Sequence, residues 1–282
     1  MKKMFTIVLA ALMVAALFAG CGSSTSETKA PETTAAPAAT AAAETATPAE
    51  TEAAAPAFTT IEAGKLIMST NAAFPPYEMV ADDGSFEGID VEIAGAIAKK
   101  LGLELVVDDM DFDAALLAVQ QGKSDIVMAG VTVNEDRKLV MNFSDTYSKG
   151  VQVVIVKEGS DVTLDNLGDQ MIGTQRGTTG YIYASGDYGE DHVTAYDNGA
   201  SAVQALMNGQ VDCVVIDSAP AQAFVENNPG LTILDTEYTS EDYAIGMNKD
   251  NTALLEAVNG ALKELTEDGT IPAIVEKYIP TK

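Results

Sequence analysis

The stretch from residue 88 to 107 reads GIDVEIAGAIAKKLGLELVV, and it decides the fold class. Its apolar residues first recur at the spacing of a helix face, from Val91 to Leu101, and Gly102 follows as a C-terminal stop. Residues 103–107 then form a short apolar run of the kind typical of a strand. A helix that passes directly into a strand is a building unit of layered α/β proteins.

The same alternation continues along the chain. Helices are predicted over residues 114–121 and 254–265, and the second of these is taken as the last helix, ending before Gly269. Further strands are predicted over residues 66–68, 125–129, 151–156, 171–173, 211–216 and 243–247. This pattern implies an α/β protein with a largely parallel sheet. The folded body, residues 61–280, is long enough for one large domain or for two lobes.

The N-terminus carries an export signal. Lys2 and Lys3 precede an apolar run over residues 4–19, which is slightly shorter than the roughly 18–20 residues of a membrane span. Cys21 follows Ala-Gly and resembles the acylated cysteine of bacterial lipoproteins, although Phe18 stands where that signal usually carries Leu. Residues 1–20 are therefore predicted to be a lipoprotein signal peptide and Cys21 the lipidation site; an ordinary signal peptide is the alternative.

Residues 21–58 are predicted to be the lipidated cysteine and a tether. The segment after Cys21 consists almost entirely of Ala, Thr, Glu, Pro and Ser and contains no Ile, Leu, Val or Met. Such a segment cannot bury enough apolar surface to offset the entropy of ordering, so we expect it to be disordered.

Composition excludes several classes of function. The net charge of −26 argues against nucleic acid as a partner, because nucleic acid is held through Lys and Arg. The only other cysteine, Cys213, lies in an apolar strand and is interpreted as a small buried hydrophobe, and the single histidine, His192, lies in a polar stretch. The chain therefore offers no disulfide scaffold, zinc site or Cys/His catalytic pair, and no cofactor is predicted.

The acidic segment over residues 109–113 looks like a calcium loop, but Ala114 stands where that loop needs Gly and Gln120 where it needs Glu. We therefore predict no metal site, and interpret Asp111 or Asp113 as a helix cap. Phe112 is placed in the cleft or in the core.

Two charged residues follow strands, where open α/β sheets bind their ligands: Asp217 ends a strand, and Arg137 comes one helical turn after a segment in which a strand ends. The chain has only two arginines against 14 lysines, so Arg137 is a selective choice whose planar fork suits a carboxylate; a structural ion pair with Glu135 or another acid is the alternative. Asp217 ends a buried strand and could receive an ammonium group or merely cap the next helix.

Other segments could complete this site. Phe74 precedes two prolines that stiffen its backbone, and it could face a ligand or cover the sheet edge. Residues 173–180 lie between a strand and a helix, where exposed N–H groups attract anions, although no nucleotide-binding pattern is matched. An arginine, an aspartate and aromatic rings together suit an α-amino acid zwitterion.

These segments resemble the extracellular solute-binding proteins of polar amino acid ABC importers, over almost all of residues 61–280. The strongest match is the GIDVEI segment at residues 88–93, and the others are FPPYE, MDFD, AGVTVNEDR, FSD, GTTG, VDCVVIDSAP and DYAIGM. The resemblance implies a two-lobe periplasmic-binding-protein fold of type II, with mixed sheets and a two-strand hinge. Lobe 1 would be residues 59–148 and 246–282, lobe 2 residues 149–245, and the hinge would lie near residues 148–150 and 243–246.

The resemblance also assigns roles to residues. Phe74 and Phe112 would pack on the ligand, and Gly130 and Thr132 would meet its polar ends. Arg137 and the loop of Thr179 would hold the α-carboxylate, and Asp217 the α-ammonium. Asn71 and Gln175 fall where members differ by ligand, and Asn71 favours a neutral polar ligand such as glutamine over a cationic one. Arg176 receives no role.

The function implied by the resemblance is capture of a free L-amino acid and its delivery to the permease subunits of an ABC importer. The protein is expected to be a monomer without enzymatic activity, held by its lipid on the outer face of the bacterial cytoplasmic membrane. A dehydratase-like enzyme of the same fold is one alternative, with Glu78 as its only suggestive glutamate. A protein that presents the ligand to a sensor is the other.

Overall fold

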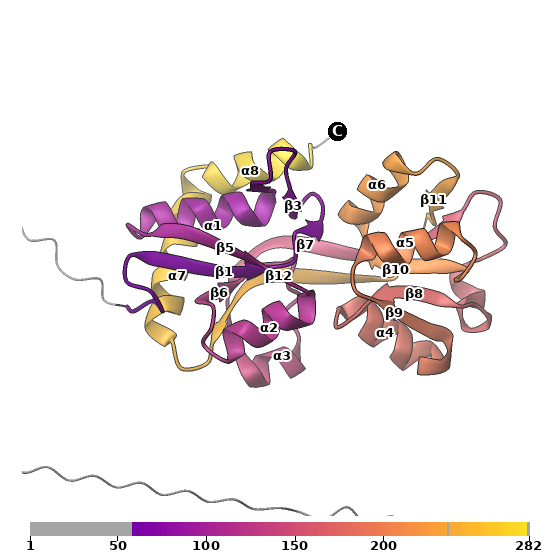
Figure 1. The fold of residues 1–282 in the computed structure, drawn as a ribbon, viewed down its shortest axis with the longest axis horizontal. Coiled ribbons are helices and arrows are strands. Elements are labelled where there is room, and N and C mark those ends of the chain that lie inside the picture. Colours follow the sequence, from indigo (N-terminus) through magenta and orange to yellow (C-terminus); the bar gives the residue numbers. More distant parts are fainter. Residues whose placement is uncertain (1–57, 236, 281–282) are drawn as a thin grey trace, which may run out of the picture. The chain divides into compact units, whose positions relative to one another are not determined.

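The computed structural model describes residues 58–235 and 237–280, which belong to one compact unit of the chain (Figure 1). The predicted signal peptide, Cys21 and the tether up to residue 57 lie outside the described residues. Among the helices that are described, none has the length and apolar character that a bilayer crossing requires.

Helices and strands alternate through most of this body, as the hydrophobic periodicity predicts. In chain order the elements are β1 (Lys65–Thr70), β2 (Ala73–Phe74), β3 (Glu78–Val80), β4 (Phe86–Glu87), α1 (Ile89–Lys100), β5 (Glu104–Asp109), α2 (Phe112–Gln120), β6 (Ile126–Val127), α3 (Glu135–Val140), β7 (Met141–Lys157), the 3₁₀ helix η1 (Leu164–Asp169), β8 (Ile172–Gln175), α4 (Thr179–Tyr188), the 3₁₀ helix η2 (Glu190–His192), β9 (Val193–Tyr196), α5 (Gly199–Met207), β10 (Cys213–Asp217), α6 (Ser218–Asn227), β11 (Leu231–Ile233), β12 (Thr239–Asn248), α7 (Thr252–Glu267) and α8 (Thr270–Tyr278).

The main sheet has the strand order β5-β1-β6-β12-β7-β10-β8-β9, with β11 added beside β7, and a small sheet joins β2, β3 and β4. In what we call the first half of the sheet, β5, β1 and β6 run parallel to one another. Strands β10, β8 and β9 are likewise parallel in the second half. The two central strands, β12 and β7, pair antiparallel with each other and with the strands on either side of them. The largely parallel sheet expected from the alternation is thus a mixed one.

The two central strands run through both halves, and Figure 1 shows them side by side along the middle of the sheet. Strand β7 has 17 residues: its beginning pairs with β12, and its end pairs with β10 and β11. The register of β12 against β7 is irregular between Tyr243 and Gly246, within the segment where the sequence predicts a hinge. An irregular pairing loosens the ladder locally, which suits a place where strands bend.

Two predicted strands are present but longer than predicted, and the prediction of the last helix was wrong. The strands predicted over residues 151–156 and 243–247 are parts of the much longer β7 and β12, because polar residues such as Asp145 and Lys149 interrupt the apolar pattern without ending the pairing. The chain also does not end with α7. Gly269, at φ 84°, turns the backbone into α8, a helix of nine residues.

Each half of the sheet has its own apolar core. Helices α1, α7 and α8 pack together on the first half, around side chains such as Leu66, Ile93 and Leu262. Helix α5 covers the second half around Val203, Val214 and Ile216. Separate cores on either side of two shared strands are what a two-lobe architecture requires.

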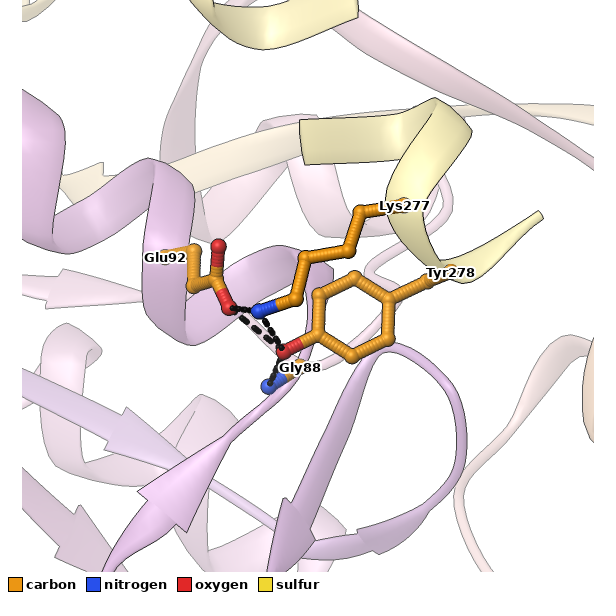
Figure 2. A network of polar contacts seen from close by, with 4 residues as sticks. All are labelled: Gly88, Glu92, Lys277 and Tyr278. Carbon is orange, nitrogen blue, oxygen red and sulfur yellow. Dashed lines mark hydrogen bonds and ion pairs between the residues drawn. The ribbon is translucent and has the colours of Figure 1, made fainter. Parts of the chain in front are cut away.

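The last helix holds the start of α1 in place (Figure 2). The hydroxyl of Tyr278 accepts a hydrogen bond from the Gly88 N–H at 3.2 Å and donates one to Glu92 at 2.5 Å, and Lys277 pairs with the same carboxylate. Gly88 begins the helix at φ 126°, where an added Cβ would lie 2.3 Å from the Tyr77 carbonyl oxygen, so only glycine fits. This close approach presses residues 76–78 against the beginning of α1.

Candidate ligand-binding site

A cavity lies between segments of the first and second halves of the sheet, beside the two central strands. All nine ligand-binding residues predicted from the sequence line it: Asn71, Phe74, Phe112, Gly130, Thr132, Arg137, Gln175, Thr179 and Asp217. The structure therefore brings together side chains that are up to 146 residues apart in the chain (Asn71 to Asp217). Their contact with a ligand stays a prediction.

The segment that carries Phe74 is fixed by the beginning of α1. The N–H groups of Ile89 and Asp90 donate to the carbonyls of Pro76 and Tyr77 at 3.0 and 2.8 Å. The ring of Phe74 stacks near Tyr77, with 6.0 Å between centroids. Phe74 therefore lines the cavity on a fixed backbone. The alternative, that it only covers the edge of the sheet, does not account for this position.

Arg137 lies on α3 and is only 7 % exposed. Its guanidinium donates to the Thr132 carbonyl at 2.8 Å and to the Gly177 carbonyl at 3.2 Å, and lies 5.4 Å from the centre of the Phe112 ring. Burial lowers the pKa of Arg137 to about 10, so it remains charged at neutral pH.

No carboxylate within residues 58–235 and 237–280 comes within 4 Å of this guanidinium, so the alternative of a structural ion pair finds no support there. A guanidinium has five N–H donors, and backbone carbonyls take only two of them here. The buried Glu241 attracts this guanidinium from beyond ion-pair distance, and a ligand carboxylate would supply a partner in direct contact.

Asp217 stands at the end of β10 and is 1 % exposed. One of its oxygens accepts the Ala219 N–H at 3.1 Å and so caps α6, and the other accepts the Val151 N–H of β7 at 2.8 Å. Burial raises the pKa of Asp217 to about 6 despite these hydrogen bonds. The residue is thus a helix cap, as one alternative held, and also a buried carboxyl group on the cavity wall.

Gly150 of β7 lies against Asp217 and Tyr243. An added Cβ would be 2.4 Å from Asp217 Oδ2 and 2.6 Å from the Tyr243 hydroxyl. We expect Gly150→Ala to displace this carboxyl group, lowering the free energy of unfolding by about 1–3 kcal/mol and weakening ligand binding. Denaturant titration and calorimetry measure the two effects. Gly186→Ala in α4, where nothing lies within 4 Å of the new methyl group, is the matched control. It should leave ligand binding unchanged and raise the free energy of unfolding by up to about 1 kcal/mol, because alanine is favoured over glycine in a helix. Equal behaviour of the two variants would contradict the packing argument.

Three direct contacts cross the cavity between the two halves. The side-chain amide of Gln175 donates to that of Asn71 at 3.0 Å, and the hydroxyls of Thr132 and Thr179 are 3.4 Å apart. The third is the bond from Arg137 to the Gly177 carbonyl. Asn71 is itself held by donation to the Met110 carbonyl at 2.8 Å. The residues expected to distinguish ligands are therefore partners of each other.

Sequence reasoning missed several residues of the cavity wall. Tyr243 of β12 and Gln152 of β7 line it, and so does Glu78, which entered only as a feature of the enzyme alternative. Gln152 pairs with Asp217 in the β7–β10 ladder, and a polar residue inside the apolar run 151–156 was a usable signal for it. Tyr243 gave no such signal, because the strand predicted there, residues 243–247, is a continuous apolar run.

Other candidates lie outside the cavity. Arg176, with 53 % of its side chain exposed, pairs with Asp197 at 3.3 Å. The thiol of Cys213 is fully buried with its pKa raised to about 12 by that burial, which confirms the interpretation as a buried hydrophobe. Asp111 is the N-cap residue of α2, but its side chain makes no capping hydrogen bond. Among the described residues, no three His, Cys, Asp or Glu side chains are grouped to hold a metal ion.

Known proteins are similar to this chain in both sequence and fold. A probable histidine-binding protein of Neisseria gonorrhoeae is 34 % identical over 235 residues, covering 80 % of this chain and 87 % of the relative. The ABC transporter glutamine-binding protein GlnH of Bacillus subtilis is 27 % identical and covers 99 % of this chain and 98 % of its own length.

Among solved structures, an ancestral arginine-binding protein bound to glutamine is 39 % identical, with a TM-score of 0.74, over 77 % of this chain and 99 % of that one. The sequence pattern described as bacterial extracellular solute-binding proteins, family 3, matches residues 66–281. With this match over most of the folded body, and with the relatives above, the chain belongs to the bacterial extracellular solute-binding proteins of family 3.

Proposed function

We propose that this protein captures a free polar L-amino acid outside the cytoplasm and delivers it to the permease subunits of an ABC importer. The observation that carries the proposal is that two buried side chains of opposite charge line one cavity. Arg137 comes from α3 and Asp217 from the end of β10. A guanidinium suits the α-carboxylate of an amino acid, and a carboxylate suits its α-ammonium.

Around these charges the cavity offers neutral polar groups and rings. Asn71, Gln175 and Gln152 supply amides, and Phe74 and Phe112 supply apolar faces. This lining favours an uncharged polar side chain such as that of glutamine. The names of the relatives include histidine-, cystine-, arginine- and glutamine-binding proteins, all of which bind amino acids with polar or charged groups.

Binding would work by closure of two lobes. We place lobe 1 at residues 59–148 and 246–282 and lobe 2 at residues 149–245, with the hinge near residues 148–150 and 243–246. A ligand that touches Arg137 in one lobe and Asp217 in the other gains both contacts only when the lobes are closed, so it shifts the population toward the closed state. The direct contacts across the cavity, such as Gln175 with Asn71, would add to that closed state.

The N-terminus would hold the protein near its importer. Cleavage after residue 20 and acylation of Cys21 would anchor the chain to the outer face of the cytoplasmic membrane, with residues 22–58 as the tether. The folded body would act as a monomer. Metabolic labelling with a fatty acid analogue tests the anchor: Cys21→Ser should abolish labelling and release the protein, whereas Cys213→Ser should do neither.

A thermal-shift screen against the twenty amino acids, cystine and ornithine tests the function. A ligand that binds only the native state raises the melting temperature, by an amount that grows with its concentration over the dissociation constant. We expect the largest shift from a neutral polar L-amino acid. The α-carboxamide and the N-acetyl derivative of the best ligand should give no shift, because each removes one of the two charges. Absence of any shift across the panel would contradict the proposal.

A further inference from the structure

Two fully buried carboxyl groups meet at the wall of the cavity. Glu78 begins β3 and Asp90 lies in the first turn of α1, and each is 0 % exposed. Their carboxyl groups lie within hydrogen-bonding reach of each other. Glu78 lines the ligand cavity, whereas Asp90 reaches it through the backbone of Gly130, whose N–H donates to Asp90 Oδ2 at 2.9 Å.

Without a proton the two carboxyl groups can only accept hydrogen bonds, so neither can donate to the other. Neither oxygen of Glu78 has a hydrogen-bond partner, and nor does Asp90 Oδ1. Two ionised carboxylates in contact and out of water repel each other strongly, so such pairs retain one proton. A proton between them supplies the donor that Glu78 and Asp90 Oδ1 lack.

The surroundings decide which residue keeps the proton. The Asp90 carboxylate accepts the Gly130 N–H and lies at the positive end of α1, and both features favour its ionised form. No N–H group donates to Glu78 in the described structure. Burial and the neighbouring Asp90 raise the pKa of Glu78 well above its usual range, and burial raises the pKa of Asp90 to about 6.

The remaining titratable neighbours do not offset this pair. The buried hydroxyl of Tyr147 in β7 lies within hydrogen-bonding reach of Asp90, as Glu78 does, and it can donate to the ionised Asp90 but leaves Glu78 without a donor. Asp109, at the end of β5, adds a further negative charge near Glu78, and Tyr77 of the preceding segment lies close to both carboxyl groups. Within the described residues no Lys, Arg or His forms an ion pair with Glu78 or Asp90.

We propose that Glu78 is a positioning residue. Its protonated carboxyl group donates a hydrogen bond to Asp90, and this bond fixes the Gly130 backbone at the ligand cavity. The contact is Glu78 O–H to Asp90 Oδ1, and Asp90 Oδ2 then accepts the Gly130 N–H. Gly130 has little freedom otherwise: at φ 55°, an added Cβ would lie 2.9 Å from the Phe74 ring and 3.2 Å from Tyr243. The role in binding rests on the proposed amino acid capture, but the shared proton does not.

A shared proton predicts a definite dependence of stability on pH. The folded protein holds this proton above the pH at which the unfolded chain loses it. The shared proton therefore contributes its full stabilisation at acidic pH, below the pKa of a carboxyl group in the unfolded chain. This stabilisation is lost as pH rises above that value and through the raised pKa of Glu78. Asp217, whose pKa is also raised, contributes a slope of the same sign, so variants are compared with the parent protein.

Glu78→Gln is the informative variant, because an amide N–H can donate to Asp90 at every pH. We measure the melting temperatures of the variant and the parent without ligand between pH 5 and 9. As pH rises through the titration range, the difference between them should shift in favour of the variant by about 3–5 °C per pH unit. Glu87→Gln removes an exposed carboxylate from β4 and makes the same change in net charge, and it should follow the parent. A constant gap between Glu78→Gln and the parent would overturn the shared proton.

Infrared spectroscopy tests the proton directly. We expect the parent protein and Glu87→Gln to show a protonated carboxyl band at pH 7 that Glu78→Gln lacks. A band of equal intensity in all three proteins would assign the proton to another group and contradict the proposal.

Ligand binding tests the positioning role. With the ligand that gives the largest thermal shift, Glu78→Gln should bind within about twofold of the parent at pH 6.5. Glu78→Met should bind at least tenfold more weakly, because Asp90 then loses the donor at position 78 that holds it against Gly130. Equal affinities of Glu78→Met and the parent would reject positioning. If no amino acid binds the parent protein, the proposed function fails while the two ligand-free measurements still decide the shared proton.

Discussion

Replacing Arg137 by alanine is expected to weaken amino acid binding by roughly 2–5 kcal/mol, which is about 30-fold to several thousand-fold in the dissociation constant. Arg137 is 7 % exposed and lines the cavity, and backbone carbonyls take only two of its five N–H donors. A ligand carboxylate closed into this site would lose its hydration and find no other cation, because Arg137 is the only Lys, Arg or His side chain on the cavity wall in the described structure.

The chain offers a matched control for this experiment. Arg176, the only other arginine, is exposed and paired with Asp197 outside the cavity, so Arg176→Ala should leave the dissociation constant unchanged. Arg137→Lys keeps the charge but not the planar fork, and should fall between the parent and Arg137→Ala. Calorimetry measures all three variants. An unchanged affinity in Arg137→Ala would exclude the carboxylate-binding role.

Asp217 is expected to make binding sensitive to acid. Its pKa is raised to about 6 in the ligand-free cavity, and an ammonium group placed beside it would lower that value. Binding must then expel a proton whenever the carboxyl is protonated. The affinity should therefore be constant at neutral pH and fall by up to about tenfold per pH unit below pH 6. Calorimetry in two buffers of different ionisation enthalpy should detect the released proton.

The variant Asp217→Asn separates charge from capping. Asparagine can still cap α6, but only one of its two side-chain atoms accepts hydrogen bonds, so the N–H of Val151 or Ala219 loses its partner. We expect the free energy of unfolding to drop by about 1–3 kcal/mol and binding to weaken by a further 2–5 kcal/mol. The residual binding should no longer depend on pH near 6. An affinity of the parent protein that stays flat from pH 7 to 5 would rule out the ammonium contact.

The sequence predicted the family, the α/β two-lobe fold and a binding protein in place of an enzyme, and all three are confirmed. The helix at residues 89–100 could be predicted because one face is apolar at a regular spacing. Arg137 could be singled out because arginine is rare in this chain, and Asp217 because an acid ends a buried strand. The boundaries of the lobes and the ligand contacts stay predictions, and the lipid anchor lies outside the described residues.

Local sequence determined which segments become helices and strands and which charges stand at their ends, because those features depend on neighbours a few residues apart. Only the tertiary structure decided that β7 and β12 run through both halves of the sheet, which the interrupted apolar pattern concealed. It also decided that Gln152 and Tyr243 line the cavity, and that Glu78 meets Asp90 out of reach of water. The pKa of a carboxyl group depends on burial and on charges from distant segments, so the properties of this pair arise only when the chain is folded.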